Sequence, residues 1–318
     1  MRLPHLPGAP ELTYCTNIHA GESWAEIRMS LDAHVPRIKA RVAPDAPFGL
    51  GLRVSGIAAA ELRDPATLGA FKEQLSRLDA YVFTLNAFPF GPFHGTRVKE
   101  QVYEPDWRTN ERVSFTRDAA EILSALLPEG GFGSISTVPG GFKPIGRDPE
   151  NVAALLDRLL QAAAHLVTIE RTTGKRIALA LEPEPCCFLE TVDEALAFFE
   201  ERLFGPAALA RFAALAGLGA GEAEPMLRRH LGVCYDVCHG AVEYEDPVAA
   251  LKRLHAAGIA VPKIQLSAAM RVPQISEPLA ARLRDFDDGV YLHQVIVRDE
   301  ALARFADLPD AFAAFRVG

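Results

Sequence analysis

Short apolar runs of strand type alternate with segments of helical periodicity along most of the chain. The runs that we expect to form strands cover residues 11–19, 48–55, 80–86, 133–138, 176–182, 231–236, 261–267 and 290–297. Between them, apolar residues recur every three or four positions, as in 22–41, where Trp24, Ile27 and Leu31 share one helical face. The pattern therefore predicts a regular alternation of strands and helices.

Strands that alternate with helices are typical of parallel βαβ units, because a parallel pair needs a crossover connection. Eight such units in 318 residues predict an α/β fold, a (β/α)₈ TIM barrel that forms a single domain over residues 1–318. A doubly wound open sheet is the structural alternative. The segment after the first strand, Thr16-Asn-Ile-His-Ala-Gly-Glu, lacks the GxGxxG fingerprint that such a sheet uses to bind dinucleotides.

Two of the predicted strands end in carboxylates. The run Leu231-Gly-Val-Cys-Tyr-Asp stops at Asp236, with His239 three residues later, and the run that begins at Ile177 stops at Glu182 and Glu184. A buried strand places a carboxylate at its end only where something there needs a charge. The carboxyl ends of barrel strands meet on one face, so we expect these groups to share one site.

Strand alternation adds further polar groups to that face, since every second side chain of a strand points inward. The predicted substrate-binding residues are Asn17, His19, Arg53, Asn86, His94, Trp107 and His239. Trp107 and His94 belong to the long loop 87–108, and we expect Trp107 to cover the pocket, since long loops are often functional. An ordinary surface excursion is the alternative for this loop.

A divalent metal is the simplest purpose for these groups. Glu182, Asp236 and His293 supply two carboxylates and one imidazole, a set suited to Mn, Zn, Fe or Co, and Gln265 adds a carbonyl oxygen. His239 either ligates this metal or holds a substrate hydroxyl. The alternative is a salt-bridged interior in which Arg53 and Lys263 neutralise the carboxylates. The five cysteines are expected to be small buried thiols, with ligation by Cys234 and Cys238 as the lesser interpretation.

Composition excludes several classes of partner. With 33 basic and 41 acidic residues the chain carries a net charge of −8, which opposes binding to nucleic acid. No signal peptide is evident, and no apolar run approaches the ~20 residues that span a bilayer. We therefore expect a cytoplasmic protein without a membrane span that binds a small-molecule metabolite, and the sequence leaves a homo-oligomer open.

At these residues the chain resembles the xylose-isomerase-like TIM barrels, a superfamily of sugar (phosphate) isomerases and epimerases that also holds endonuclease IV. Those enzymes typically use a Glu from strand five and an Asp-x-x-His from strand six, which Glu182, Asp236 and His239 match. This chain differs from those enzymes at strands seven and eight, where it has Gln265 and His293 in place of the usual His and Glu.

Within that superfamily the chain is most similar to the metabolite-traffic protein EboE family. The stretches that carry this resemblance are LTYCTNIHAGESW (12–24), NAFPFGPFHGTRVKEQVYEPDW (86–107), ALEPEPCCFLET (180–191), CYDVCHGAVEYED (234–246) and KIQLSAA (263–269). The resemblance implies a protein of bacterial gene clusters that move or mature secondary-metabolite precursors.

The leading hypothesis is a metal-dependent enzyme of the sugar isomerase or epimerase type that acts on a small polyhydroxylated or carbonyl metabolite. Lys263 or Glu184 is expected to transfer the proton, because burial beside a metal brings such pKa values toward neutrality. A non-catalytic carrier that binds a pathway metabolite is the second hypothesis. A phosphodiesterase like endonuclease IV is the third, and the acidic charge and few ligands oppose it.

Overall fold

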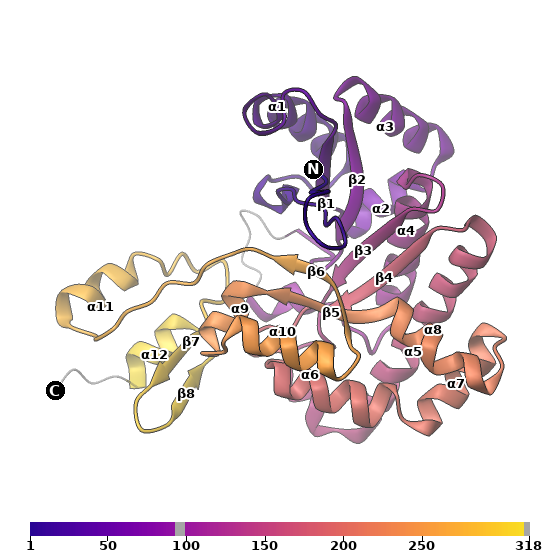
Figure 1. The fold of residues 1–318 in the computed structure, drawn as a ribbon. Helices are drawn as coiled ribbons and strands as arrows, with labels where there is room; N and C mark the ends of the chain where they lie inside the picture. The colour runs from indigo at the N-terminus through magenta and orange to yellow at the C-terminus, as the bar shows by residue number, and fades with distance from the viewer. Residues whose placement is uncertain (93–98, 315–318) are drawn as a thin grey trace.

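A curved sheet of six parallel strands lies at the centre of the protein, whose computed structural model describes residues 1–92 and 99–314 (Figure 1). The strands follow one another in sequence order across the sheet: β1 (Phe48–Arg53), β2 (Ala80–Asn86), β3 (Phe132–Thr137), β4 (Arg176–Leu181), β5 (Leu231–Asp236) and β6 (Ala260–Gln265). In the register of the last pair, Asp236 lies opposite Gln265. Sequential parallel strands place all their carboxyl ends on one edge of the sheet.

Helices precede, connect and follow these strands, and most of the connecting ones cover the outer face of the sheet (Figure 1). They are α1 (Trp24–Val42), α2 (Gly56–Leu62), α3 (Pro65–Arg77), α4 (Asn110–Leu126), α5 (Pro149–Thr173), α6 (Val192–Phe198), α7 (Pro206–Ala216), α8 (Ala220–His230), α9 (Val237–Val242), α10 (Pro247–Ala256), α11 (Glu277–Arg284) and α12 (Leu308–Ala314), with the short turns η1 (Thr16–Ile18), η2 (Lys99–Tyr103), η3 (Lys143–Arg147) and the π-helical η4 (Phe199–Leu203). Side-chain caps set several starts: Ser23 and Glu26 form a capping box at α1, and Asp64 caps α3.

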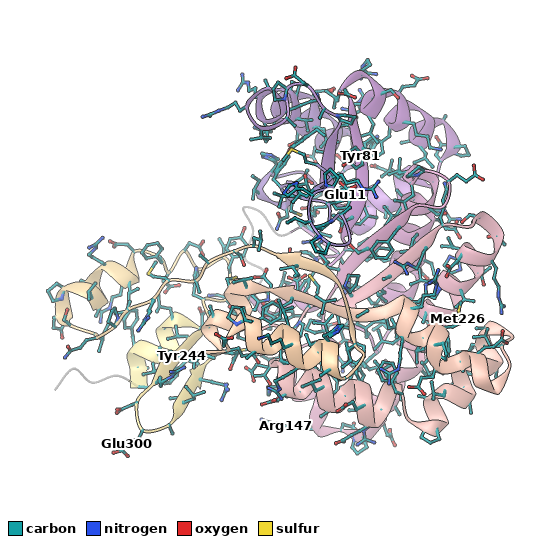
Figure 2. The ribbon with its side chains drawn as sticks, in the orientation of Figure 1. Glu11, Tyr81, Arg147, Met226, Tyr244 and Glu300 are labelled. Carbon is teal, nitrogen blue, oxygen red and sulfur yellow. The ribbon has the colours of Figure 1, made fainter. Side chains whose placement is uncertain are left out.

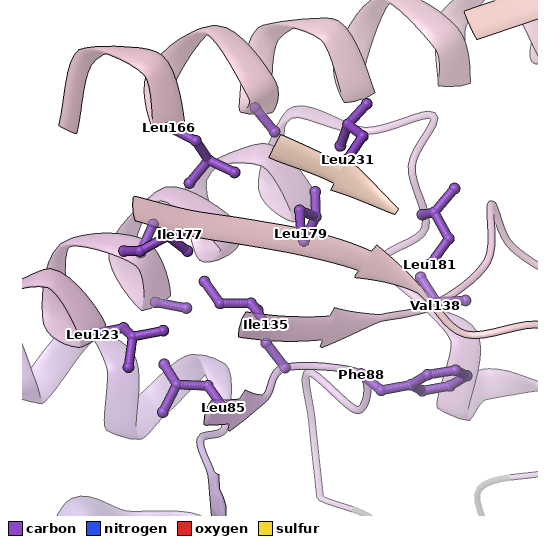
Figure 3. Packing of buried hydrophobic residues seen from close by; sticks show 14 of the residues in the cluster. Leu85, Phe88, Leu123, Ile135, Val138, Leu166, Ile177, Leu179, Leu181 and Leu231 are labelled. Carbon is purple, nitrogen blue, oxygen red and sulfur yellow. The ribbon is translucent and has the colours of Figure 1, made fainter. Parts of the chain in front are cut away.

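The core fills the space between the sheet and its helices. Ile177, Leu179 and Leu181 of β4 point to this side, where Leu166 of α5 packs on them (Figure 3). Ala178 and Ala180 alternate with them, as expected for a strand whose other face is the crowded barrel interior. Bulk on the helix side and small residues inside are the pattern that the sequence predicts for this strand.

Helix α5 is long and apolar enough to cross a membrane by length and composition alone. Half of its most apolar window is buried inside the structure, and Leu166 belongs to the core described above. The central helix of a globular core meets the same criteria, so this helix is weak support for a membrane span.

The prediction of an α/β barrel-type fold is confirmed, but two of the eight predicted strands do not join the sheet. Segment 11–19 contributes a single parallel bridge, between Cys15 and Gly51, and then turns into η1. There the hydroxyl of Thr16 accepts the backbone N–H of Arg53 at 2.9 Å, which takes a donor that a continuing strand would use. The predicted first strand is therefore wrong, because residues 11–19 form two isolated bridges and a 3₁₀ turn.

The predicted eighth strand, 290–297, also forms a different structure. Its last residues begin β7 (Val295–Arg298), which pairs antiparallel with β8 (Leu302–Phe305) in a separate two-stranded sheet. Helix α12 follows β8 along the chain. In Figure 2, Tyr244 lies beside this hairpin and Glu300 lies at its tip. The guanidinium of Arg298 stacks on the Tyr244 ring, 3.8 Å from the ring centre.

The hairpin is held against the carboxyl-end face of the sheet by charged contacts. Arg304 of β8 donates to Glu243 at 2.8 Å, and Lys99 of η2 forms an ion pair with Asp307 and donates to the carbonyl of Tyr291 at 2.9 Å. These contacts bring the segment before β7 next to the loop after β2, on the edge where the strands end.

Candidate functional site

Glu182 follows the last residue of β4 and is almost completely buried. Its side chain is 5% exposed, and Oε2 makes no hydrogen bond to any residue that the structure describes. Burial raises the pKa of Glu182, and nearby Asp236 raises it too, whereas His239 and Lys263 lower it. A buried carboxylate with an unpaired oxygen costs stability, so its place at a strand end indicates a functional reason.

Asp236 ends β5 and is the N-cap of the short helix α9. Its Oδ1 accepts the backbone N–H of Cys238 at 2.9 Å and the hydroxyl of Ser267. The same N–H lies 2.9 Å from the Ser267 oxygen. These bonds fix the turn that carries Asp236, Cys238 and His239, and the two that the carboxylate accepts here use its Oδ1 oxygen.

Asp236, Cys238 and His239 form a group of metal-ligand type in the described part of the chain. One carboxylate oxygen, the thiol sulfur and one ring nitrogen all lie within 4.8 Å of one another. The Nδ1 atom of His239 lies 3.0 Å from the carbonyl oxygen of Pro183. Because that oxygen can only accept, Nδ1 carries the proton of a neutral ring and Nε2 presents a lone pair, as in many metal-binding histidines.

The electrostatics of this group are those of an acidic, poorly solvated site. Burial alone lowers the pKa of His239, but Glu184, Asp236 and Glu182 outweigh it and raise the pKa overall. Burial raises the pKa of the Cys238 thiol to about 12, and Asp236 adds to this rise. Several negative groups that face a single imidazole favour an additional cation at this position.

A cavity of about 200 Å³ opens beside Glu182 at the carboxyl-end edge. Its polar and apolar lining residues come from four separate regions of the chain: Asn17, Asn86, Phe88, Pro89, Lys99, Val102, Tyr103, Glu182, Glu184, Tyr291, Leu292 and Gln294. The volume suits a small metabolite, and the amide and carboxylate groups suit hydroxyls.

Glu184 lies on the wall of this cavity, held by two side chains from distant segments. The hydroxyl of Tyr103 donates to Oε1 at 2.9 Å, and Nε2 of Gln294 donates to the same oxygen at 3.0 Å. Tyr103 is 1% exposed, so its hydroxyl has a fixed position. Burial raises the pKa of Glu184, and these two hydrogen bonds lower it only in part.

Several other predicted residues lie at the same edge. Asn17 and Asn86 line the cavity, and Oδ1 of Asn86 accepts the backbone N–H of Phe88 at 3.1 Å. Gln265 lies opposite Asp236, with its buried Nε2 unpaired within the described residues. Lys263 directs its Nζ to the carbonyl of Leu85 at 3.2 Å and the hydroxyl of Ser136 at 3.0 Å.

Arg53 and Trp107 do not have the predicted environments. Arg53 binds both oxygens of Glu22, at 2.9 and 2.8 Å, whereas Lys263 is the cation of that alternative that lowers the pKa of Glu182. Trp107 is fully buried and donates through Nε1 to the carbonyl of Val138 at 3.0 Å. It is a core residue and does not cover the pocket.

The predicted histidines also separate. The backbone N–H of His293 donates to Asp307 at 3.0 Å, and its ring nitrogens lie 3.7 Å from Asp307 and 3.9 Å from Asp288. Its ring therefore faces the hairpin, and of the four predicted metal ligands only Asp236 belongs to the compact group. His19 stacks on His34 with ring centres 3.9 Å apart, beside a second cavity of about 10 Å³. His94 lies outside the described residues.

Tyr103 and Gln294 are the site residues that sequence reasoning did not find. The only signal for Tyr103 is its place in the unusually long loop after β2. Gln294 is adjacent to His293. A prediction of inward-pointing residues that is shifted by one position therefore selects His293 in place of Gln294.

Comparisons with known proteins give similarity in fold at low identity. No protein-family model matches the chain, and no curated protein matches it. Among solved structures it is similar to the 3-keto-D-glucoside 4-epimerase YcjR from E. coli, with 12% identity, a TM-score of 0.40, and coverage of 86% of this chain and 98% of that one. The IOLI protein with a bound zinc atom shows 12% identity and a TM-score of 0.44, over 84% of this chain and 77% of that one. A xylose isomerase domain protein from Alicyclobacillus acidocaldarius shows 15% identity and a TM-score of 0.42, over 83% of this chain and 81% of that one.

Proposed function

We propose that this protein is a metal-dependent barrel enzyme that isomerises or epimerises a small polyhydroxylated or carbonyl metabolite. The observations that carry the proposal are the compact donor group of Asp236, Cys238 and His239 at the end of β5 and the buried, unpaired oxygen of Glu182 at the end of the adjacent strand β4. A divalent metal (Mn, Zn, Fe or Co) would supply a Lewis acid that stabilises negative charge on substrate oxygens. The resemblance to the EboE family suggests a precursor of secondary metabolism as the substrate.

Asp236 and His239 would hold such a metal. The N–H of Cys238 and the hydroxyl of Ser267 orient the carboxylate through its Oδ1, and the Pro183 carbonyl orients the imidazole through its Nδ1. Fixing a ligand through its second polar atom is the usual means of pre-organising a metal site.

Glu184 is the residue best placed for proton transfer. It lines the cavity, Tyr103 and Gln294 hold its Oε1, and its raised pKa moves it toward the pH range in which a carboxylate both takes and returns a proton. Lys263, the other predicted candidate, already donates to Leu85 and Ser136, which leaves Glu184 as the better assignment. Glu184 would remove a proton from the carbon next to a carbonyl and return it to carbon.

Metal content tests the first half of the proposal. We expect near-stoichiometric metal, by elemental mass spectrometry, in protein purified without chelator, and its loss in Asp236→Ala. Asp246→Ala is the matched control, because Asp246 caps α10 through the N–H of Ala249 as Asp236 caps α9, but lies outside the donor group. Wild-type protein that stays metal-free after reconstitution would contradict metal dependence.

Deuterium exchange tests the second half. In D₂O, wild-type protein should exchange carbon-bound hydrogen of a turned-over sugar or sugar phosphate, as followed by NMR. Glu184→Gln should lose this exchange and keep its metal, because the amide cannot accept the proton. A metabolite that binds in the cavity without exchange in a broad screen would favour the non-catalytic carrier.

A further inference from the structure

Cys238 belongs to the proposed metal group. Its backbone N–H is fixed by the Asp236 carboxylate and the Ser267 oxygen, both at 2.9 Å. Its sulfur lies within 4.8 Å of a carboxylate oxygen of Asp236 and a ring nitrogen of His239. The two neighbours offer hard and borderline donors, and the sulfur is the only soft donor of this group.

A second, independent feature points to a cation at this position. Glu182 is only 5% exposed, and its Oε2 has no hydrogen-bond donor in the described parts of the chain. His239 and Asp236 act electrostatically on its carboxylate, and Glu182 follows β4, the strand that pairs with β5, which ends at Asp236. A buried acceptor without a donor costs about 1–3 kcal/mol, a cost that a nearby metal ion removes.

We propose that Cys238 binds the metal as a thiolate, which makes the site selective for zinc-class ions over Mg²⁺ and Mn²⁺. Thiolate and imidazole donors suit Zn²⁺ and Co²⁺, whereas sites built from carboxylates, carbonyls and water suit Mg²⁺, Ca²⁺ and Mn²⁺. The inference rests on the metal site of the proposed function and deepens it by naming the class of ion.

Binding changes the protonation of this thiol. The Sγ–H bond breaks, the sulfur–metal bond forms from the sulfur electron pair, and the proton leaves to solvent. Metal binding to wild-type protein should therefore release about one more proton than binding to a variant without the thiol.

Cobalt spectroscopy tests the proposal on the full chain. After chelator treatment and dialysis, Co²⁺ added to the wild type should produce a sulfur-to-cobalt charge-transfer absorption in the near ultraviolet. Cys238→Ser should lose this band and bind Zn²⁺ at least about tenfold more weakly, as expected for loss of a ligand. Cys186→Ser is the matched control, because Cys186 is also a half-buried thiol near this edge but lies outside the donor group.

The outcomes separate the two proposals. Co²⁺ that binds the wild type without a charge-transfer band, or a band that survives in Cys238→Ser, overturns the thiolate assignment and leaves the metal site standing. Wild-type protein that binds neither Co²⁺ nor Zn²⁺ overturns both. Calorimetry of Zn²⁺ binding in buffers of different ionisation enthalpy supplies the proton count, and equal release by wild type and Cys238→Ser also contradicts thiolate ligation.

Discussion

Replacing Glu22 with alanine should destabilise the fold and leave the metal site intact. Arg53 is 2% exposed, and its guanidinium binds both oxygens of Glu22 as well as the carbonyls of Gly21, at 2.7 Å, and Gly91, at 3.1 Å. Removal of one partner from a buried ion pair costs about 3–5 kcal/mol, because the remaining charge stays buried. The Glu22 side chain is 20% exposed, so water replaces it in part and we expect the lower end, about 3 kcal/mol.

Denaturant and thermal unfolding of Glu22→Ala, the wild type and Asp118→Ala measure this effect. Asp118 pairs with Arg63, whose side chain is 56% exposed, so its loss should cost at most about 1 kcal/mol. For a chain of 318 residues, a loss of about 3 kcal/mol corresponds to a fall in Tm of roughly 4–5 °C. Glu22→Ala that unfolds like Asp118→Ala refutes the reasoning, and loss of metal from Glu22→Ala would return Arg53 to the site.

Three further predictions concern packing, pH and the cavity. Gly232→Ala should cost about 1–3 kcal/mol, since a Cβ there lies 2.4 Å from a backbone carbonyl of the neighbouring strand, whereas Gly69→Ala, with open space around it, should not destabilise. The pKa values of Glu182 and Glu184 are higher in the folded than in the unfolded protein, so metal-free protein should be most stable below the unfolded glutamate pKa and lose stability as pH rises through the folded pKa values. Unfolding titrations at different pH values measure this loss, and Glu182→Gln should make it smaller. In Tyr103→Phe the pKa of Glu184 should rise further, because a hydrogen bond that favours its charged form is gone, so the acid limb of the deuterium-exchange rate should move to higher pH.

The central strands could be predicted closely from the sequence. The predicted 80–86 and 231–236 coincide with β2 and β5, and 176–182 exceeds β4 by one residue. Strands buried on both faces read as continuous apolar runs between turn residues, and that signal is local. The carboxylates at their ends were predicted to share one edge for the same reason, because parallel strands fix where their carboxyl ends lie.

The partner of a strand could not be predicted in the same way. Val295, Ile296 and Val297 have the composition of a strand, but nothing local distinguishes a parallel place beside β6 from an antiparallel pairing with residues 303–305. The hairpin places Gln294 at the cavity and turns His293 toward Asp307. The contacts of Glu184 with Tyr103 and Gln294 join residues 81 and 110 positions away, a separation that periodicity does not address.

The tripeptide Glu182-Pro183-Glu184 explains why the metal group and the cavity form one site. The carbonyl of Pro183 sets the tautomer of His239, the carboxylate before it lies buried beside the donor group, and the carboxylate after it lines the cavity. Proline restricts the residue before it to an extended conformation and its own φ to a narrow range, so the two carboxylates keep a fixed spacing. Motion of this turn would shift an imidazole and a proton-transfer group together, and metal affinity and proton transfer are therefore expected to change in parallel when Pro183 is replaced by glycine.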